Sequence, residues 1–198
     1  MKYTPTKVAG VTIIDLELRR DHRGFTWRSF CARDFAAHGL NLDVAQTNIV
    51  FNYTRGTVRG LHRTVPPHAE ATLLRCTRGA IVAAAVDVRP DSLTYGDHVM
   101  IELAADDHRT LFLPPYVAHG FQTLVDDTEV TYHTSGRHAA AEEQGLRWDD
   151  PEFGVTWPIP VTVISEQDAS WPSAQTRLAP PYGGGGTTIR RACGSPTR

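Results

Sequence analysis

Short apolar segments recur along almost the whole chain, and turn-forming residues separate them. Such segments are typical of β-strands, and their regular spacing is typical of all-β proteins. They span residues 11–18, 45–53, 71–76, 80–88, 98–103, 110–113, 121–124 and 129–134. No long amphipathic helix with capping residues lies between them, which disfavours an α/β doubly wound fold. The pattern therefore predicts an all-β sandwich or barrel.

Turn residues support this prediction. The triplet Thr77-Arg78-Gly79 predicts a tight hairpin, because glycine adopts the positive φ that such a connection needs. A second reversal is expected at residues 105–108, and residues 34–38 are expected to form one short helix.

Length and composition predict one folded domain with a tail. The chain has 198 residues, of which 41% are hydrophobic, and this suits a single core. After residue 174 the composition shifts to Pro, Gly, Thr and Arg, with four consecutive glycines at 183–186. We expect a domain over residues 1–174 and a flexible tail over residues 175–198. The glycine run has no strand before it and no helix after it, as a phosphate-binding loop would need.

The charge and the cysteines exclude several classes of protein. The formal net charge is -2, so no excess of positive charge attracts nucleic acid or an anionic membrane. No apolar run reaches the length of about 18 residues that spans a bilayer, and no secretory signal is visible. The three cysteines are widely spaced and odd in number, so neither a disulfide framework nor a zinc ribbon is expected. We expect a cytoplasmic protein without nucleic-acid or membrane partners.

Lysine is nearly absent. Of the 20 basic residues only Lys2 and Lys7 are lysines, so the rest of the chain carries its positive charge on arginine. A lysine Schiff base, and with it pyridoxal-phosphate chemistry, is therefore not expected.

Histidine, by contrast, occurs nine times. His62 precedes a pair of prolines and is expected near the end of a strand that lines a cavity, where an imidazole can act as a base. Two other interpretations remain open from the residues alone. His62 is a structural histidine in the first, and in the second it binds a metal together with His68, Glu70 and His119. The prolines interrupt the strand between His62 and His68, which weighs against the metal site.

Eight short motifs then follow one another in a characteristic order. They are Asp21-His22-Arg23-Gly24, Gln46-Thr47-Asn48, Val58-Arg59-Gly60-Leu61-His62, Val86-Asp87-Val88-Arg89, Ser92-Leu93-Thr94-Tyr95-Gly96, Ala118-His119-Gly120-Phe121, Trp148-Asp149-Asp150-Pro151 and Trp157-Pro158. In this succession the chain resembles the dTDP-4-dehydrorhamnose 3,5-epimerases. The resemblance implies a single-domain, cupin-like jelly roll (a double-stranded β-helix) with a few short helices. It also implies a homodimer without metal or cofactor that acts on dTDP-linked 4-keto-6-deoxy sugars.

The same resemblance implies roles for individual residues. His62 would be the base that removes a proton beside the ketone, Asp168 would orient its imidazole, and Tyr132 would be the acid that reprotonates the enolate from the opposite face. Arg23 and Arg59 match positions that hold the diphosphate, and a guanidinium suits a phosphate because it donates two parallel hydrogen bonds. The other matched positions that hold nucleotide or sugar are Gln46, Asn48, His119 and Glu143.

Four positions depart from the family's pattern in the same expected cavity. The family's enolate-stabilising lysine is Thr72, a glutamate is Arg28, a tyrosine six residues after the acid is His138, and a basic residue before the aspartate is Gln167. Arg28, Thr72 and His138 are expected to line the substrate pocket, and Arg28 is expected to pair with Glu70. Loss of one oxyanion donor typically costs about 10²- to 10³-fold in rate.

The preferred function is therefore isomerisation of a nucleotide-linked keto sugar at a carbon next to the ketone. One alternative is a redirected lyase, dehydratase or cyclase that acts on a non-nucleotide small molecule, which the loss of the lysine suggests. The other is a ligand-binding module without turnover. Retention of the base, the orienting carboxylate and the acid favours an enzyme.

Overall fold

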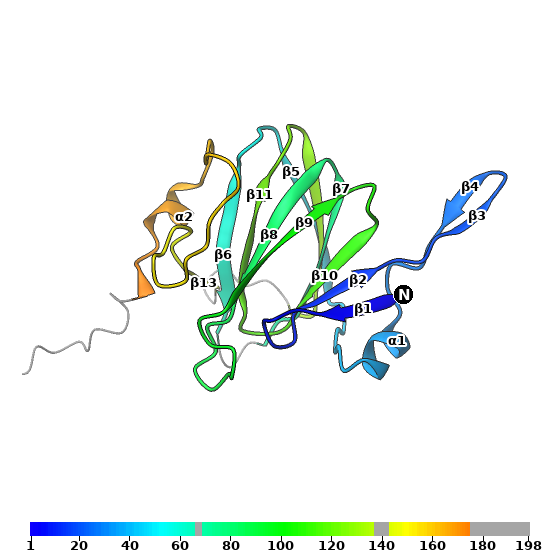
Figure 1. Ribbon diagram of the computed structural model, residues 1–198, viewed down its shortest axis with the longest axis horizontal. Helices are drawn as coiled ribbons and strands as arrows, with labels where there is room; N and C mark the ends of the chain where they lie inside the picture. Colours follow the sequence, from blue (N-terminus) through cyan, green and yellow to red (C-terminus); the bar gives the residue numbers. More distant parts are fainter. Residues whose placement is uncertain (66–68, 137–142, 175–198) are drawn as a thin grey trace, which may run out of the picture.

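The computed structural model describes residues 1–65, 69–136 and 143–174, and its body consists of two antiparallel β-sheets packed face to face (Figure 1). The six-stranded sheet has the order β1-β2-β10-β7-β12-β5, and the five-stranded sheet has the order β13-β6-β11-β8-β9. The strands of the first sheet are β1 (Lys2–Pro5), β2 (Thr12–Asp15), β10 (Arg109–Leu113), β7 (Thr72–Arg78), β12 (Thr128–Thr134) and β5 (Gln46–Asn52). Those of the second are β13 (Glu143–Gly145), β6 (Val58–Thr64), β11 (Ala118–Thr123), β8 (Ala80–Val86) and β9 (His98–Ala104). The predicted all-β jelly roll is confirmed.

Alternate residues of the central strands build the core between the sheets. On β8, Ile81 and Ala83 belong to this core, whereas Ala84 and Val86 belong to a second core on the outer face of the five-stranded sheet. Residues from the segment 146–174, among them Phe153, complete that second core. β8 is thus buried on both faces, which explains its unbroken apolar sequence.

The hairpin predicted at Gly79 is confirmed. Gly79 lies between β7 and β8 and has a φ of 79°. A Cβ at this position would lie 2.6 Å from Oγ1 of Thr128, so both the conformation and the space require glycine.

A third core lies on the outer face of the six-stranded sheet, where helix α1 (Ala32–Ala37) packs. This helix corresponds to the one expected near residues 34–38. Its Phe35 is fully buried, and its ring meets those of Tyr3 and Phe30 edge to face. The first residues of the chain are thereby held against the sheet.

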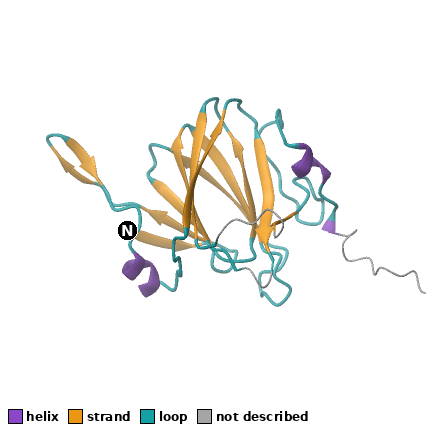
Figure 2. Cartoon of the chain, turned by 180° about the vertical axis from the view of Figure 1, so that it is seen from behind, coloured by secondary structure: helices purple, strands orange, loops and turns teal. Residues whose placement is uncertain are grey.

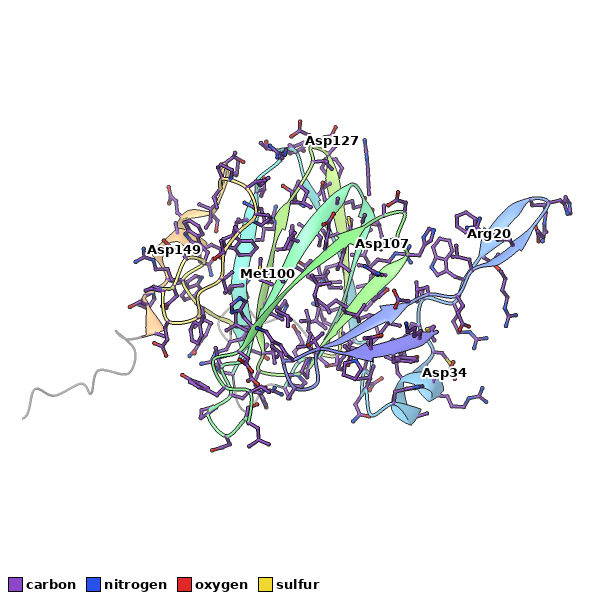
Figure 3. The ribbon with its side chains drawn as sticks, viewed as in Figure 1. Arg20, Asp34, Met100, Asp107, Asp127 and Asp149 are labelled. Carbon is purple, nitrogen blue, oxygen red and sulfur yellow. The ribbon has the colours of Figure 1, made fainter. Side chains whose placement is uncertain are left out.

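A small hairpin of β3 (Arg19–Asp21) and β4 (Gly24–Thr26) projects from this body (Figures 1 and 2). The residues of both strands are exposed, so the sequence offers no apolar alternation by which to predict them. At the base of the hairpin, Phe25 stacks on Trp27, and the Arg75 guanidinium lies 4.8 Å from the centre of the Trp27 ring. Figure 3 shows Arg20 of this hairpin far from Met100 and Asp149 of the body.

In the part of the chain that the structure describes, no helix is long and apolar enough to cross a membrane. The expected tail, residues 175–198, lies outside the described residues, and the domain boundary at residue 174 stays a prediction.

Candidate active site

A histidine and a buried carboxylate meet beside the edge of the five-stranded sheet. Nε2 of His62, on β6, lies 2.6 Å from Oδ1 of Asp168. Asp168 belongs to the short helix α2 (Glu166–Ser170) and is only 4% exposed. The fold therefore brings together the two residues expected to be the base and its orienting carboxylate.

Local hydrogen bonds fix the Asp168 side chain. The Ser165 hydroxyl caps α2 by accepting the backbone N–H of Asp168 at 3.0 Å, and so starts the helix at the right residue. Oδ2 of Asp168 accepts the backbone N–H of Gly60 at 3.1 Å, while Oδ1 faces His62. Both carboxylate oxygens are thus engaged.

These contacts favour the ionised form of Asp168 and set the tautomer of a neutral His62. Burial raises the pKa of the Asp168 carboxyl, but the hydrogen bonds from His62 and Gly60, together with the nearby Trp171 side chain, outweigh burial and hold that pKa below its usual value. Ionised Asp168 can only accept hydrogen bonds, so Nε2 of His62 carries the shared proton. In the neutral imidazole, Nδ1 of His62 then carries the lone pair and is the nitrogen that can act as a base.

Two glycines let β6 and β11 approach closely beside this pair. A Cβ on Gly60 would lie 2.7 Å from the backbone oxygen of His119, and a Cβ on Gly120 would overlap the backbone oxygen of Arg59. Gly60 also has a φ of 109°. The two motifs that contain these glycines thereby place His62 opposite His119 in the strand register.

His119 is a neutral group in this site. Its Nδ1 lies 3.3 Å from the backbone oxygen of Val117, which can only accept, so Nδ1 donates and Nε2 keeps a lone pair. Burial lowers the pKa of His119 to about 4; the Val117 bond opposes this shift and the neighbouring His62 adds to it. At neutral pH, His119 can accept a hydrogen bond from a hydroxyl group of a ligand.

The six-stranded sheet supplies the facing wall. Tyr132 of β12 pairs with Asn48 of β5 and Leu74 of β7, so these side chains share a face. Leu74 belongs to the core between the sheets, and the Tyr132 ring lies 6.4 Å from that of Phe121 on β11. Gln46 and Thr72 both pair with Thr134 and therefore lie on the same face as Tyr132. This wall thus contains Gln46, Asn48, Thr72 and Tyr132.

Arg59 joins the two sheets. It is opposite Phe121 in the register of β6 and β11, and its Nε donates to Oδ1 of Asn52 on β5 at 2.7 Å. This bond uses one of the five guanidinium donors, and the side chain is exposed, so further donors can reach a ligand.

The structure does not bring Arg23 to this site within one chain. Arg23 lies in the turn of the projecting hairpin and pairs with Asp21 at 2.7 Å. Arg23 and Arg59 therefore do not converge on one pocket wall of a single chain.

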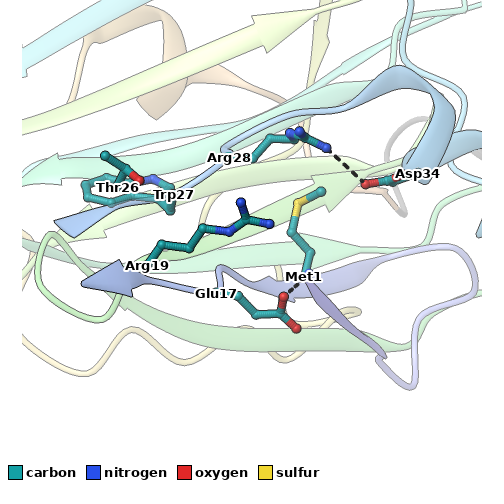
Figure 4. Close-up of a pocket in the computed structure, with 7 residues that line it drawn as sticks. All are labelled: Met1, Glu17, Arg19, Thr26, Trp27, Arg28 and Asp34. Atoms are coloured by element: carbon teal, nitrogen blue, oxygen red, sulfur yellow. Dashed lines mark ion pairs between the residues drawn. The ribbon is translucent and has the colours of Figure 1, made fainter. Parts of the chain in front are cut away.

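Arg28 lies at the base of the hairpin. It lines a cavity of about 510 Å³ together with Met1, Glu17, Arg19, Thr26, Trp27 and Asp34 (Figure 4). Among the described residues Arg28 forms its ion pair with Asp34 at 3.8 Å, so the expected pair with Glu70 is not formed. The hypothesis rested on a supposed shared cavity, whereas Arg28 lies between the hairpin and α1.

Some expected site residues are not placed. His138 and His68 lie outside the described residues. The backbone of Glu143 begins β13 and pairs with Thr64 of β6, close to His62 in the register. Within residues 1–65, 69–136 and 143–174, no group of three His, Cys, Asp or Glu side chains is arranged to hold a metal ion.

Comparison with known proteins decides which family this architecture represents. A model of the dTDP-4-dehydrorhamnose 3,5-epimerases matches residues 5–176. The chain belongs to the dTDP-4-dehydrorhamnose 3,5-epimerase family. An epimerase of this name from Sinorhizobium fredii is 39% identical over 174 residues, which cover 87% of this chain and 89% of that protein.

Solved structures of epimerases share the fold. The dTDP-4-dehydrorhamnose 3,5-epimerase of Elizabethkingia anophelis superposes with a TM-score of 0.86 at 29% identity, over 89% of this chain and 98% of that chain. A 4-keto-6-deoxy sugar epimerase from the novobiocin biosynthetic gene cluster of Streptomyces spheroides gives 0.83 at 32% identity, over 89% of each chain. The resemblance seen in the sequence motifs is thereby confirmed.

The sequence analysis did not predict three contacts of this site. The Gly60 N–H contacts Asp168 on α2, and the Asn52 amide oxygen accepts from Arg59 between the two sheets; both contacts depend on how separate elements pack, for which the sequence gives no signal. The Ser165 cap has a signal, because serine followed three residues later by an acidic residue resembles a helix start.

Proposed function

We propose that this protein epimerises a dTDP-linked 4-keto-6-deoxy sugar at a carbon next to the ketone. The observation that carries the proposal is the contact of 2.6 Å between Nε2 of His62 and buried Asp168. It leaves Nδ1 of His62 as a base whose tautomer and orientation are fixed. Family membership supplies the class of substrate.

The chemistry follows from the placement of base and acid. A ketone acidifies the neighbouring C–H, so His62 can remove that proton and form an enolate. His62 comes from the five-stranded sheet and Tyr132 from the six-stranded sheet. Proton removal on one face and delivery on the other inverts the carbon, and groups on two opposed walls suit such a reaction.

The enolate oxygen needs a hydrogen-bond donor, and we assign this role to Thr72. Thr72 shares a face with Tyr132 and is 2% exposed, so its hydroxyl is shielded from bulk water. A neutral hydroxyl stabilises an oxyanion less than an ammonium group does. We therefore expect this protein to epimerise its substrate slowly. Because Thr72 is a weak donor, the test below also has an outcome that would indicate a redirected lyase, dehydratase or cyclase.

Binding of the diphosphate is assigned to Arg59, and to Arg23 of a second copy of the chain. Arg23 sits on a hairpin that leaves the body of its own chain (Figure 1). This position favours a homodimer in which each hairpin reaches the site of the neighbour. Cytoplasmic localisation remains an expectation from the sequence.

Hydrogen exchange tests the proposal. The protein is incubated with thymidine diphosphate 4-keto-6-deoxyglucose in deuterated water, and NMR follows the C–H signals that flank the ketone. We expect one or both signals to disappear, and the His62→Ala variant to slow this loss at least about 10²-fold. His98→Ala is the matched control, because His98 lies on β9 at the opposite edge of the five-stranded sheet. Binding without exchange would instead support a binding module, and neither binding nor exchange would support a redirected enzyme.

A further inference from the structure

Trp171 lies directly against the strand that neighbours His62. It follows α2, and its indole Nε1 is buried. A Cβ added to Gly145 of β13 would overlap the atoms of this indole, and Gly145 pairs with His62 in the strand register. The indole therefore fills the space of a side chain that Gly145 lacks, one strand away from the base.

The same indole also acts on the carboxylate that orients the base. Its N–H joins those of His62 and Gly60 in favouring the ionised form of Asp168 and so contributes to the lowered pKa of that group. Trp171 directly follows Ser170, the last residue of α2, and lies three positions after Asp168, so we expect a shift of the ring to displace the helix that carries the carboxylate.

The segment that contains α2 is held before and after the helix by one hydrogen bond on each side. Before α2, the backbone N–H of Val58 donates to the backbone oxygen of Val163 at 2.9 Å. After α2, the backbone N–H of Ala174 donates to Oδ2 of Asp150 at 2.7 Å. Between these anchors, the Trp171 indole packs on Gly145 of β13.

We propose that Trp171 is a positioning residue that wedges against Gly145 and holds the Asp168 carboxylate on Nε2 of His62. The inference rests on the proposed function, since it assumes that the orientation of His62 matters for turnover. In this role Trp171 acts through Asp168 and not directly on the substrate. Gly145 is glycine because a larger residue would expel the ring.

Kinetics of three variants test this role. Trp171→Ala removes the wedge, Gly145→Ala displaces it, and Trp171→Phe keeps a ring but loses the N–H. We expect kcat to fall about 10- to 100-fold in the first two and less in the third, with KM changed less than about twofold, because misplacing a supporting group acts on the chemical step. In the variant that combines Gly145→Ala with Trp171→Ala, kcat should equal that of Trp171→Ala alone, because the overlap is gone.

Trp157→Phe is the matched control. The Trp157 indole N–H donates to the backbone oxygen of Trp148 at 2.9 Å and belongs to the outer core, so its loss is expected to affect stability but not kcat. If Trp171 has only a structural role, its variants will unfold more easily while the folded fraction keeps the wild-type kcat. That result would overturn the proposal.

A spectroscopic readout keeps this test independent of turnover. The proton between Nε2 of His62 and Asp168 is expected to give a far-downfield proton NMR signal, which His62→Ala abolishes. Trp171→Ala and Gly145→Ala should remove or broaden this signal, and Trp157→Phe should preserve it. An inactive wild type with these spectral changes would refute the proposed function and support the positioning role; an unchanged signal in Trp171→Ala would refute the positioning role.

Discussion

Replacing Asp168 with asparagine isolates the electrostatic part of the pair formed with His62. Aspartate and asparagine side chains have nearly the same shape, so the amide oxygen in Asp168→Asn can still accept the Gly60 N–H that Oδ2 of Asp168 accepts at 3.1 Å. The amide has no charge, however, and its NH₂ group can donate to His62. That donation would move the imidazole proton to Nδ1 and block the nitrogen that acts as the base.

The expected magnitude follows from the contact of 2.6 Å to buried Asp168. A hydrogen bond to a charged group contributes about 1.5–3 kcal/mol, and about 1.4 kcal/mol corresponds to a tenfold change in rate. Loss of orientation alone therefore costs about 10- to 100-fold, and the wrong tautomer extends the loss toward about 10⁴-fold. KM should change little, because Asp168 faces His62 and not the substrate.

Deuterium exchange beside the ketone, measured at saturating substrate, gives the rate, and chemical denaturation gives the stability of the same preparation. We expect Asp168→Asn to remain folded at neutral pH while the exchange rate falls at least tenfold. A folded variant that exchanges at the wild-type rate would refute the assignment of His62 and Asp168 as base and orienting group.

Three further predictions concern the walls of the site. Thr72→Lys should raise the exchange rate by about 10-fold or more by restoring a charged donor for the enolate, whereas Thr72→Met should not; equal rates in the two variants would contradict the role of this position. The pKa of His119 is lowered from 6.5 to about 4 by burial, so the unfolded chain binds more protons in this interval. The free energy of unfolding should therefore decline as pH falls from 6.5 toward 4, and His119→Gln should flatten that decline in denaturant titrations. Mixing inactive Arg23→Ala and His62→Ala proteins should restore about a quarter of the wild-type sites through mixed dimers; no recovery after verified subunit exchange would argue against a shared site.

The strands of the body were predictable because burial leaves a pattern in the sequence. The unbroken apolar run of β8 and the glycine of the β7–β8 turn each have a local cause, namely burial on both faces and a positive φ. The projecting hairpin leaves no such pattern in the sequence, because its strands are exposed and a few contacts at its base hold it in place.

The site was predictable only in part. Family motifs named His62 and Asp168, and the fold brings them together across 106 positions of the sequence. The expected ion pair between Arg28 and Glu70 is not formed, because the fold places Arg28 beside Asp34 of α1. The sequence alone does not show which charged side chains the fold brings together. The contact between Trp171 and Gly145 joins two segments with no shared pattern, and only the packed structure shows it.

The central claim is that His62 removes a proton on one face of the substrate and Tyr132 delivers one on the other. The most direct measurement compares deuterium exchange and inversion of configuration in Tyr132→Phe, by NMR of the same reaction in deuterated water. The two groups lie on opposed sheets, so we predict that exchange continues with retained configuration, returned by His62, while inversion falls at least about tenfold. Equal loss of exchange and inversion, or inversion at the wild-type rate, would contradict the account.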